Sequence, residues 1–397
     1  MQLTLTGTLD TDNDTLTWAA RDYGDTIHHR PNAVLRPGDP TDISTVVRYA
    51  HLHGVPVVPR GAGHSTGGQS QAPGGIVIDM TCLSTIHEIG FDRVVVDAGA
   101  RWSDIVRATL PHGLTPPVLT DYLELTVGGT LSVGGLGGAS HHHGAQTDHV
   151  LALDVVTPTG ELISCNPHEN RELFVAVRAG RGRNGIITRA TLRLIPAPET
   201  VVWHKLRYDA IDELVADQRL LVTTDAFNYV EGQLKVRGGR FVAELEAVSF
   251  AGSRSGQLTD LHPQDGETDT VTYWDFVNRL TTAEPLLREA GLWDSPHPWC
   301  NVIVPDKAAE EVLRGLGGKL GSTLYSDFGL VLAYPLRADR ITTPLLRLPH
   351  DRLVFLIAAL RYAPTDAPDI VAAMEQANDA LIAVARQAGG TLYLDPL

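Results

Sequence analysis

The segment 61–69, GAGHSTGGQ, contains residue types that suit two different kinds of chemistry. Its centre, G-H-S-T-G, matches the G-x-S-x-G nucleophile elbow of hydrolases, in which Ser65 would attack a carbonyl carbon. Gly61, Gly63, Gly67 and Gly68 could instead turn backbone N–H groups toward an anion, because glycine tolerates positive φ. The segment is therefore either a nucleophile turn or an anion-binding loop.

The flanking residues argue against the nucleophile elbow. Such an elbow needs a strand that runs directly into its first glycine and a helix that begins after the serine. Residues 59–62 separate the expected strand from Gly63, and the glycines and prolines of TGGQSQAPGG after Ser65 disfavour a helix. We interpret the segment as an anion-binding loop, without the Rossmann fingerprint because no helix opens on it.

A second glycine-rich segment, TVGGTLSVGGLGGASHHHG at 126–144, could bind an anion in the same way. Two such segments predict a long cofactor with two phosphates, held in an extended pose. The run His141-His142-His143 at the end of the second segment could suggest a metal. Adjacent histidines seldom converge on one ion, so we expect a structural or surface role and no metal site.

Short apolar runs and helical patterns surround these segments. We expect a helix over 41–52, capped by Thr41 or Asp42 and ended by Gly54, and a helix over 102–110 capped by Ser103. Strands are expected at 55–59, 75–80, 93–99 and 185–195, with a hairpin at 151–165 and a helix at 171–180. This α+β layout predicts a domain boundary near 198. Beyond it, helices and strands alternate, with a surface loop at 250–270 and a very short strand after 389.

The composition limits the class of protein. A length of 397 residues suggests two or three domains, and a net charge of -15 argues against a nucleic-acid partner. The N-terminus lacks a signal-peptide pattern, and the apolar run at 353–360 is too short to span a membrane. Three cysteines without metal spacing favour a reducing environment, so we expect a cytoplasmic protein.

Several motifs resemble those of cytokinin dehydrogenases in the vanillyl-alcohol oxidase flavoprotein superfamily. They are PRGAGHS, TDYLELTVGGTLS, HGAQ, NRELFVAVRAGRGRNGIITRATL, YVEG, PHPWCN and the late YL. The resemblance is dense over 32–198 and sparse afterwards. It implies a two-domain α+β flavoprotein of the PCMH type. Residues 1–198 would form an FAD-binding domain of two α/β subdomains, 199–380 a substrate domain with an antiparallel sheet and helices, and 381–397 a truncated return to the FAD domain.

The resemblance also implies roles for single residues. His64 would be joined covalently to the 8α carbon of FAD, and Asp121 would accept a proton from a substrate amine. Glu124 stands where related berberine-bridge enzymes have a second, cysteine tether, so one covalent link is expected. Trp299 and Glu231 would line the substrate pocket, although core packing suits them equally. The other expected FAD contacts are Pro59, Arg60, Gly61, Ala62, Gly63, Ser65, Gln69, Thr126, Gly128, Gly129, Ser132, Leu136, Ile187 and Tyr393.

The implied activity is hydride transfer to FAD from a C–H next to nitrogen in a small molecule, converting an amine to an imine, in specialised metabolism. Oxygen or another acceptor would take the electrons. The alternatives are an alcohol or alditol oxidase and a non-redox flavin scaffold that binds or cyclises a substrate. The family's C-terminal segment has no counterpart after Tyr393. We therefore expect either a flavin edge that is more open than in longer relatives or one that another subunit covers, as in a homo-oligomer.

Overall fold

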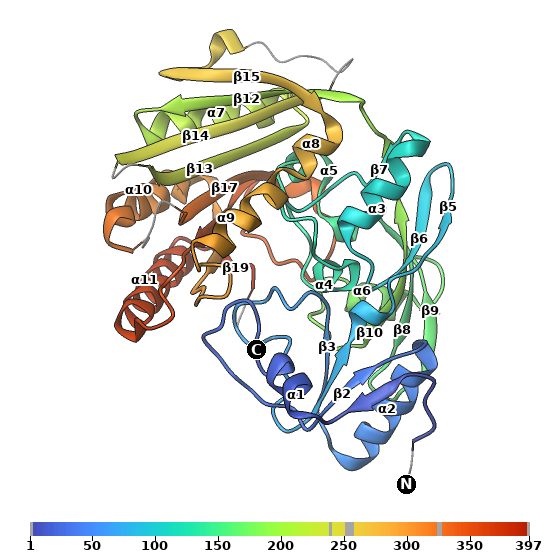
Figure 1. Ribbon diagram of the computed structural model, residues 1–397. Coiled ribbons are helices and arrows are strands. Elements are labelled where there is room, and N and C mark those ends of the chain that lie inside the picture. The colour runs from blue at the N-terminus through green and yellow to red at the C-terminus, as the bar shows by residue number, and fades with distance from the viewer. Residues whose placement is uncertain (1–2, 238–239, 251–257, 324–327, 395–397) are drawn as a thin grey trace.

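The computed structural model describes residues 3–237, 240–250, 258–323 and 328–394, which form a mixed α+β fold with three main sheets (Figure 1). Two of these sheets come from the chain before Thr200, and the third comes from the chain after it. The expected α+β class, with a large antiparallel sheet in the second half, is confirmed. The domain limits at 198 and 380 remain predictions.

The first sheet has four strands in the order β1-β2-β4-β3, of which β2, β4 and β3 are parallel. Helix α2 ends at Gly54 in a left-handed conformation, as expected. The expected N-caps Thr41 and Asp42 are wrong: Asp39 caps the helix, because Pro40 takes its first position, where a missing N–H costs nothing. The elements are β1 (Thr8–Asp10), α1 (Asn13–Ala19), β2 (Ala33–Arg36), α2 (Pro40–His53), β3 (Val57–Arg60) and β4 (Ile76–Asp79).

The second sheet has five antiparallel strands in the order β5-β6-β10-β8-β9, and the expected hairpin is its β8–β9 pair. Ser103 does not cap α3 as expected; it is buried inside the helix, and Arg101 precedes the first turn. The elements are β5 (Ile86–Ile89), β6 (Arg93–Asp97), α3 (Trp102–Thr109), β7 (Leu114–Thr115), α4 (Val127–Leu131), α5 (Ser140–His143), β8 (Val150–Val156), β9 (Leu162–Cys165), α6 (Arg171–Val177), β10 (Ile186–Arg193) and β11 (Ile195–Pro196), which pairs with β7.

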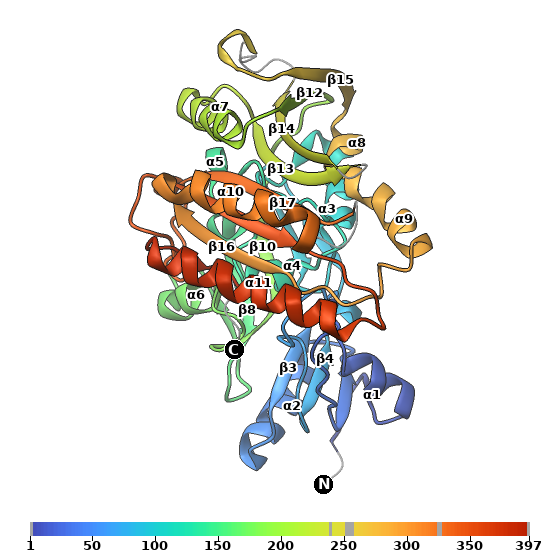
Figure 2. The same cartoon turned by 90° about the vertical axis from the view of Figure 1, so that its left-hand side faces the viewer.

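The third sheet has eight antiparallel strands in the order β15-β12-β14-β13-β17-β18-β16-β19. Three long helices, α7, α10 and α11, cover one of its faces (Figure 2). The strands are β12 (Thr200–Tyr208), β13 (Tyr229–Arg237), β14 (Arg240–Phe250), β15 (Asp265–Thr272), β16 (Cys300–Pro305), β17 (Leu330–Arg337), β18 (Leu353–Leu360) and β19 (Thr391–Leu392). The helices are α7 (Ile211–Thr224), α8 (Tyr273–Val277), α9 (Ala283–Glu289), α10 (Asp306–Thr323) and α11 (Pro368–Gln387).

The other face of this sheet packs against the first half of the chain. Successive residues of a strand point to opposite faces, so Phe355 and Ile357 of β18 lie in the core under the helices, whereas Leu356 packs with Leu136 and Tyr334. Helix α5 also contacts β13 and β17. The second glycine-rich segment is therefore held directly against the eight-stranded sheet.

Part of the expected surface loop at 250–270 is wrong, because residues 265–270 belong to β15, which pairs with β12 at the sheet edge. Residues 251–257 of that loop lie outside the described part. The strand expected after 389 is the two-residue β19.

Cys82, Cys165 and Cys300 are all free. Among the described residues, every helix is too short or too polar to cross a bilayer.

Candidate active site

The loop 61–69 follows β3 directly and is anchored to the segment 22–25. Tyr23 N–H donates to the Gly63 carbonyl at 2.8 Å, and Gly24 N–H donates to the Ser65 carbonyl at 3.1 Å. Positive φ occurs at Gly63 (70°) and Gly68 (76°) but not at Gly61 or Gly67. Ser65 Oγ donates to Asp22 at 3.1 Å and lies 3.1 Å from Ser70 Oγ, which fits an anchoring role and not a nucleophile.

Gly61 has a different role: it lets the two glycine-rich segments touch. A Cβ added at Gly61 would lie 2.0 Å from Thr126 Oγ1, so any side chain there would collide with the start of the second segment. A Cβ at Gly128 would lie 2.9 Å from the Ala98 side chain. The glycines at these positions are needed for close approach of the backbone. The two expected anion-binding segments therefore form one surface.

Backbone donors on this surface are available to a ligand. Within the described part of the chain, the N–H groups of residues 61–66 have no protein acceptor, whereas Gly68 N–H donates to Asp22 Oδ2 at 2.7 Å and Gly67 N–H to Gln69 Oε1 at 2.9 Å. Unpaired N–H groups in a glycine-rich loop can turn toward one anion, so they fit a pyrophosphate. The residues present are thus compatible with the expected FAD.

Arg60, at the end of β3, places a cation under the same loop. Its side chain is 6% exposed and donates to the Arg21 carbonyl and to Ser70 Oγ, while its Nε has no hydrogen-bond partner among the described residues. Burial lowers the pKa of the guanidinium, and Asp22 and Asp79 counteract that effect. A buried cation that lacks a direct carboxylate partner adds positive potential beside the free N–H groups.

His64 lies in a stack of aromatic rings. Its imidazole faces the Tyr23 ring, with centroids 3.9 Å apart, and Tyr23 in turn stacks on His297 at 3.9 Å. Tyr122 stacks on His64 at 5.0 Å, and the Trp299 ring meets it edge-on at 5.8 Å. Burial, with a smaller effect of His297, lowers the pKa of His64 to about 3. The imidazole is therefore neutral near pH 7, and no hydrogen-bond partner for it occurs among the described residues.

The other expected FAD contacts lie along the second segment and around it. Ser132 Oγ donates to the Gly128 carbonyl at 2.7 Å, and Gly135 N–H donates to Tyr393 Oη at 3.0 Å. Leu136 packs in one cluster with Tyr393. Ile187 is buried in β10. At the expected position of a second tether, Glu124 pairs with Arg101 at 2.9 Å. The structure thus gathers these residues around one region, although their contacts with FAD remain predictions.

Asp121 is held by three donors from the second half of the chain. Tyr229 Oη of β13 donates to Oδ1 at 2.6 Å, Tyr334 Oη of β17 donates to Oδ2, and Arg279 Nη2 lies 3.1 Å from Oδ1. Burial raises the pKa of both tyrosines well above the usual value, so each keeps its proton and donates. Tyr122, the next residue, reaches His64. The short segment from Asp121 to Tyr122 thus links the donors around Asp121 to the aromatic stack of His64.

Glu231 is buried behind Tyr229 with an exposed fraction of 1%. Its carboxyl contacts Tyr229 Oη and lies 3.2 Å from Arg279 Nη2, and Gln233 Nε2 donates to it at 2.7 Å. Burial, followed by the charges of Asp121 and Glu246, raises the pKa of Glu231 well above its usual value. Glu231 therefore belongs to the same acidic group as Asp121.

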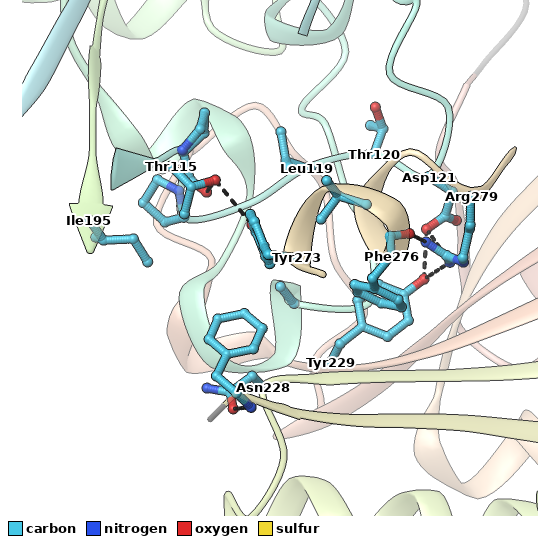
Figure 3. A pocket seen from close by; sticks show the side chains of 15 residues that line it. Thr115, Leu119, Thr120, Asp121, Ile195, Asn228, Tyr229, Tyr273, Phe276 and Arg279 are labelled. Atoms are coloured by element: carbon cyan, nitrogen blue, oxygen red, sulfur yellow. Dashed lines mark hydrogen bonds and ion pairs between the residues drawn. The ribbon is translucent and has the colours of Figure 1, made fainter. Parts of the chain in front are cut away.

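A hollow next to Asp121 lies between the loop 115–121, α8 and the ends of β13 and β14 (Figure 3). Asp121 and Arg279 stand together at one end, and the hydroxyls of Thr115 and Tyr273 meet at 3.0 Å elsewhere in it. Most of its wall is apolar, with Leu119, Ala139, Ile195, Phe250, Phe276 and Val277. The described residues that line it do not include Trp299 or Glu231. Trp299 instead stands by His64, with its Nε1 donating to the Arg361 carbonyl at 3.0 Å.

Sequence reasoning missed Tyr23, Tyr334 and Arg279. Tyr23 and Arg279 occur outside the recognised motifs, and nothing in a single sequence says that they reach loops more than 35 residues away.

The histidine run behaves as expected: His141 is buried with both ring nitrogens near backbone carbonyls, and His142 pairs with Asp225 at 2.7 Å. In the described part of the chain, no group of potential ligands could hold a metal.

Comparison with known proteins gives two family matches and several relatives. Residues 31–166 match the FAD binding domain, and residues 266–394 match the family "Cytokinin dehydrogenase 1, FAD and cytokinin binding". An oxidoreductase of the fasciation locus in Rhodococcoides fascians is 38% identical, with 98% of this chain and 90% of the relative covered. Cytokinin dehydrogenase 10 of Oryza sativa is 35% identical, covering 96% and 80%. Cytokinin dehydrogenase 4 of Arabidopsis thaliana is 32% identical, covering 91% and 79%.

Proposed function

The chain belongs to the family of FAD-dependent oxidoreductases that contains the cytokinin dehydrogenases, and we propose that it oxidises a secondary amine of a small molecule to an imine. The observation that carries this proposal is the carboxylate of Asp121, which is held by three donors and is followed in the chain by Tyr122 of the His64 stack. In this reaction the substrate loses a hydride from carbon and a proton from nitrogen. The protein must therefore place both a hydride acceptor and a base.

Bound FAD would supply the hydride acceptor. The N–H groups of residues 61–66 would bind its pyrophosphate, with Arg60 below them adding positive potential. His64 would form the covalent link through a ring nitrogen. Three properties support it: the imidazole is neutral at pH 7, its orientation is held by the Tyr23 ring, and it has no hydrogen-bond partner among the described residues.

Asp121 would accept the N–H proton as the C–H hydride leaves, so that the nitrogen lone pair can form the C=N bond. A general base must be ionised and lie within hydrogen-bond reach of the proton that it takes. The donors Arg279, Tyr229 and Tyr334 stabilise the ionised form and fix its orientation. The electrons would then pass to oxygen or to another acceptor.

The substrate would be mostly apolar around its amine. The hollow at Asp121 has an apolar wall, and the rings around His64 offer planar surfaces for an aromatic group. A cytokinin, in which a secondary amine joins an aromatic purine to an apolar chain, has this combination. The names of the relatives support the same substrate class.

Anaerobic mixing of the FAD-loaded protein with candidate substrates tests this proposal. Cytokinins and other secondary amines should bleach the flavin absorbance, whereas alcohols of the same carbon skeleton should not. Bleaching by the alcohols alone would replace the amine proposal with an alcohol oxidase. A flavin that is bound but reduced by no member of either series would contradict a redox function for these substrate classes.

A further inference from the structure

The guanidinium of Arg279 lies close to three carboxyl groups, whereas a simple ion pair has one. It opens the short 3₁₀ helix η5 (Arg279–Thr282) between α8 and α9, and its side chain is 10% exposed. Its guanidinium lies 3.1 Å from Asp121, 3.2 Å from Glu231 and 3.4 Å from Glu246. The three carboxyls come from a loop, β13 and β14. Carboxyls from three separate parts of the chain therefore share the positive charge of Arg279.

The charges around Arg279 do not balance if every acid is ionised. Glu244 is paired with Lys235, which leaves three carboxyls for one guanidinium. Two excess negative charges in a buried site are unfavourable, so at least one carboxyl should hold a proton. Burial raises the pKa of Glu246 as well as that of Glu231.

The hydroxyl of Tyr229 requires a proton on one of its two neighbouring carboxyls. Its oxygen contacts Asp121, Glu231 and, at 2.6 Å, Arg279 Nη2, yet the hydroxyl has only one hydrogen to donate. If both carboxyls were ionised, one of these contacts would set two oxygens against each other without a hydrogen. If Glu231 is protonated, it donates to Tyr229, and Tyr229 donates to Asp121. Every contact is then a hydrogen bond, although the reverse arrangement with Asp121 protonated would satisfy Tyr229 as well. Two further observations favour the proton on Glu231: Asp121 has an additional donor in Tyr334, and the Glu231 side chain is 1% exposed, against 12% for Asp121.

We propose that Arg279 is a positioning residue that keeps Asp121 ionised as the proton acceptor and leaves the excess proton of the acidic group on Glu231. This inference rests on the proposed function of Asp121. Arg279 acts through Asp121. Of the two carboxyls that share Tyr229, Asp121 is the more accessible, with an exposed side-chain fraction of 12% against 1% for Glu231, so the ionised carboxyl is the accessible one.

The groups that face Asp121 come from every element packed against it. They are Tyr229 and Glu231 of β13, Glu246 of β14, Tyr334 of β17 and Arg279 of η5, with Lys235 and Glu244 behind them. Arg279 and Lys235 are the cations of this group. Removal of Arg279 therefore leaves Asp121 facing two carboxyls without a direct positive partner among the described residues.

The variants Arg279→Gln and Arg279→Lys separate the charge from the shape of the side chain. Arg314→Gln is the matched control, because Arg314 is an exposed arginine of α10 paired with Asp212. For Arg279→Gln we expect flavin reduction at pH 7 to slow by roughly 10- to 100-fold, with normal FAD content. The midpoint of the acid limb should move to higher pH, because an opposite charge no longer favours the carboxylate. Arg279→Lys should restore part of both effects, and the control should match wild type.

A double variant tests the charge argument itself. Glu231→Gln in the Arg279→Gln background removes one acid, so the midpoint should move back toward the wild-type value. If Arg279→Gln and the double variant both have the wild-type acid limb, the proposal is overturned. If Arg279→Gln does not fold, the pH profiles of Arg279→Lys and of the double variant still test the proposal. Substitution of an arginine with a purely structural role would leave the acid limb of these profiles unchanged.

Infrared difference spectroscopy can measure the protonation of the Asp121 carboxyl directly, in the absence of substrate. The C=O band of protonated Asp121, identified by its loss in Asp121→Asn, should appear at higher pH in Arg279→Gln than in wild type. An unshifted band would contradict the role of Arg279 even if amine oxidation is correct. Conversely, the band could be shifted in Arg279→Gln while no amine reduces the flavin of the wild-type protein. This result would support the role of Arg279 in keeping Asp121 ionised and would contradict the proposed function.

Discussion

The imidazole of His64 lies face to face with the ring of Tyr23, with centroids 3.9 Å apart and planes 19° from parallel. This contact holds the imidazole in one orientation, and burial lowers its pKa to about 3. A neutral imidazole with a free nitrogen can be a nucleophile at pH 7. The loop thus presents His64 in the form that covalent attachment of a flavin requires.

We predict that FAD is covalently attached to His64. After acid precipitation of the wild-type protein, the yellow colour should stay with the pellet. In His64→Gln the flavin should still bind to the native protein through the loops but should pass into the supernatant on precipitation. Flavin that leaves the wild-type pellet completely would disprove the covalent link while leaving FAD binding intact.

Gly61→Ala should abolish or strongly weaken FAD binding, because its Cβ would collide with Thr126 Oγ1 at 2.0 Å and push the two glycine-rich segments apart. The measurement is flavin content per protein after gel filtration, together with the melting temperature. Gly315→Ala is the control: Gly315 is exposed in α10, nothing lies within 4 Å of an added Cβ, and alanine there should stabilise the helix by about 0.5–1 kcal/mol.

The collision can be relieved in a second variant. Thr126→Ala removes the obstructing hydroxyl, so the double variant Gly61→Ala/Thr126→Ala should recover part of the flavin content. Full flavin content in Gly61→Ala alone would mean that the segments need not touch to hold the cofactor.

The unfolding free energy should depend on the partly buried His143. Burial, and then its histidine neighbours, lower its pKa from 6.5 to about 3. Between these values the unfolded chain binds more protons at this position than the folded protein, so stability should fall as the pH decreases from about 6.5 toward 3. In His143→Gln the fall should be shallower. Urea unfolding of the protein at several pH values measures it, with the exposed His168→Gln as control, and equal slopes for wild type and His143→Gln would refute the prediction.

Local patterns predict much of the fold because they act over a few residues. Glycine at 54 ends α2, and the P-T-G turn at 158–160 joins β8 to β9, each within one turn of chain. The cap of α2 was wrong by two or three positions, since a proline at the first helical position and an aspartate before it decide together. Strand β15 was missed because its residues, DGETDTVT, are polar, and its pairing with β12 stabilises it from outside the segment.

The candidate site was predictable in part for the same reason. His64 and Asp121 lie in contiguous motifs, whereas the donors to Asp121 come from residues 229, 279 and 334. These contacts arise only when the eight-stranded sheet packs against the second glycine-rich segment. Arg279 looks like an ordinary helix arginine in the sequence TYWDFVNRL, and its burial among three carboxyls is a tertiary property.

Asp121→Asn, measured by stopped-flow reduction of the flavin by a secondary amine without oxygen, tests the proposed mechanism most directly. The variant keeps the size of the side chain but cannot accept the proton. FAD should remain bound, while reduction should slow by roughly 10²- to 10⁴-fold, equivalent to about 3 to 5 kcal/mol of transition-state stabilisation. Wild-type reduction should fall as the carboxylate protonates at low pH, and the variant should lack that limb. Reduction as fast in Asp121→Asn as in wild type, with the same pH profile, would show that Asp121 is a structural residue and would contradict the mechanism.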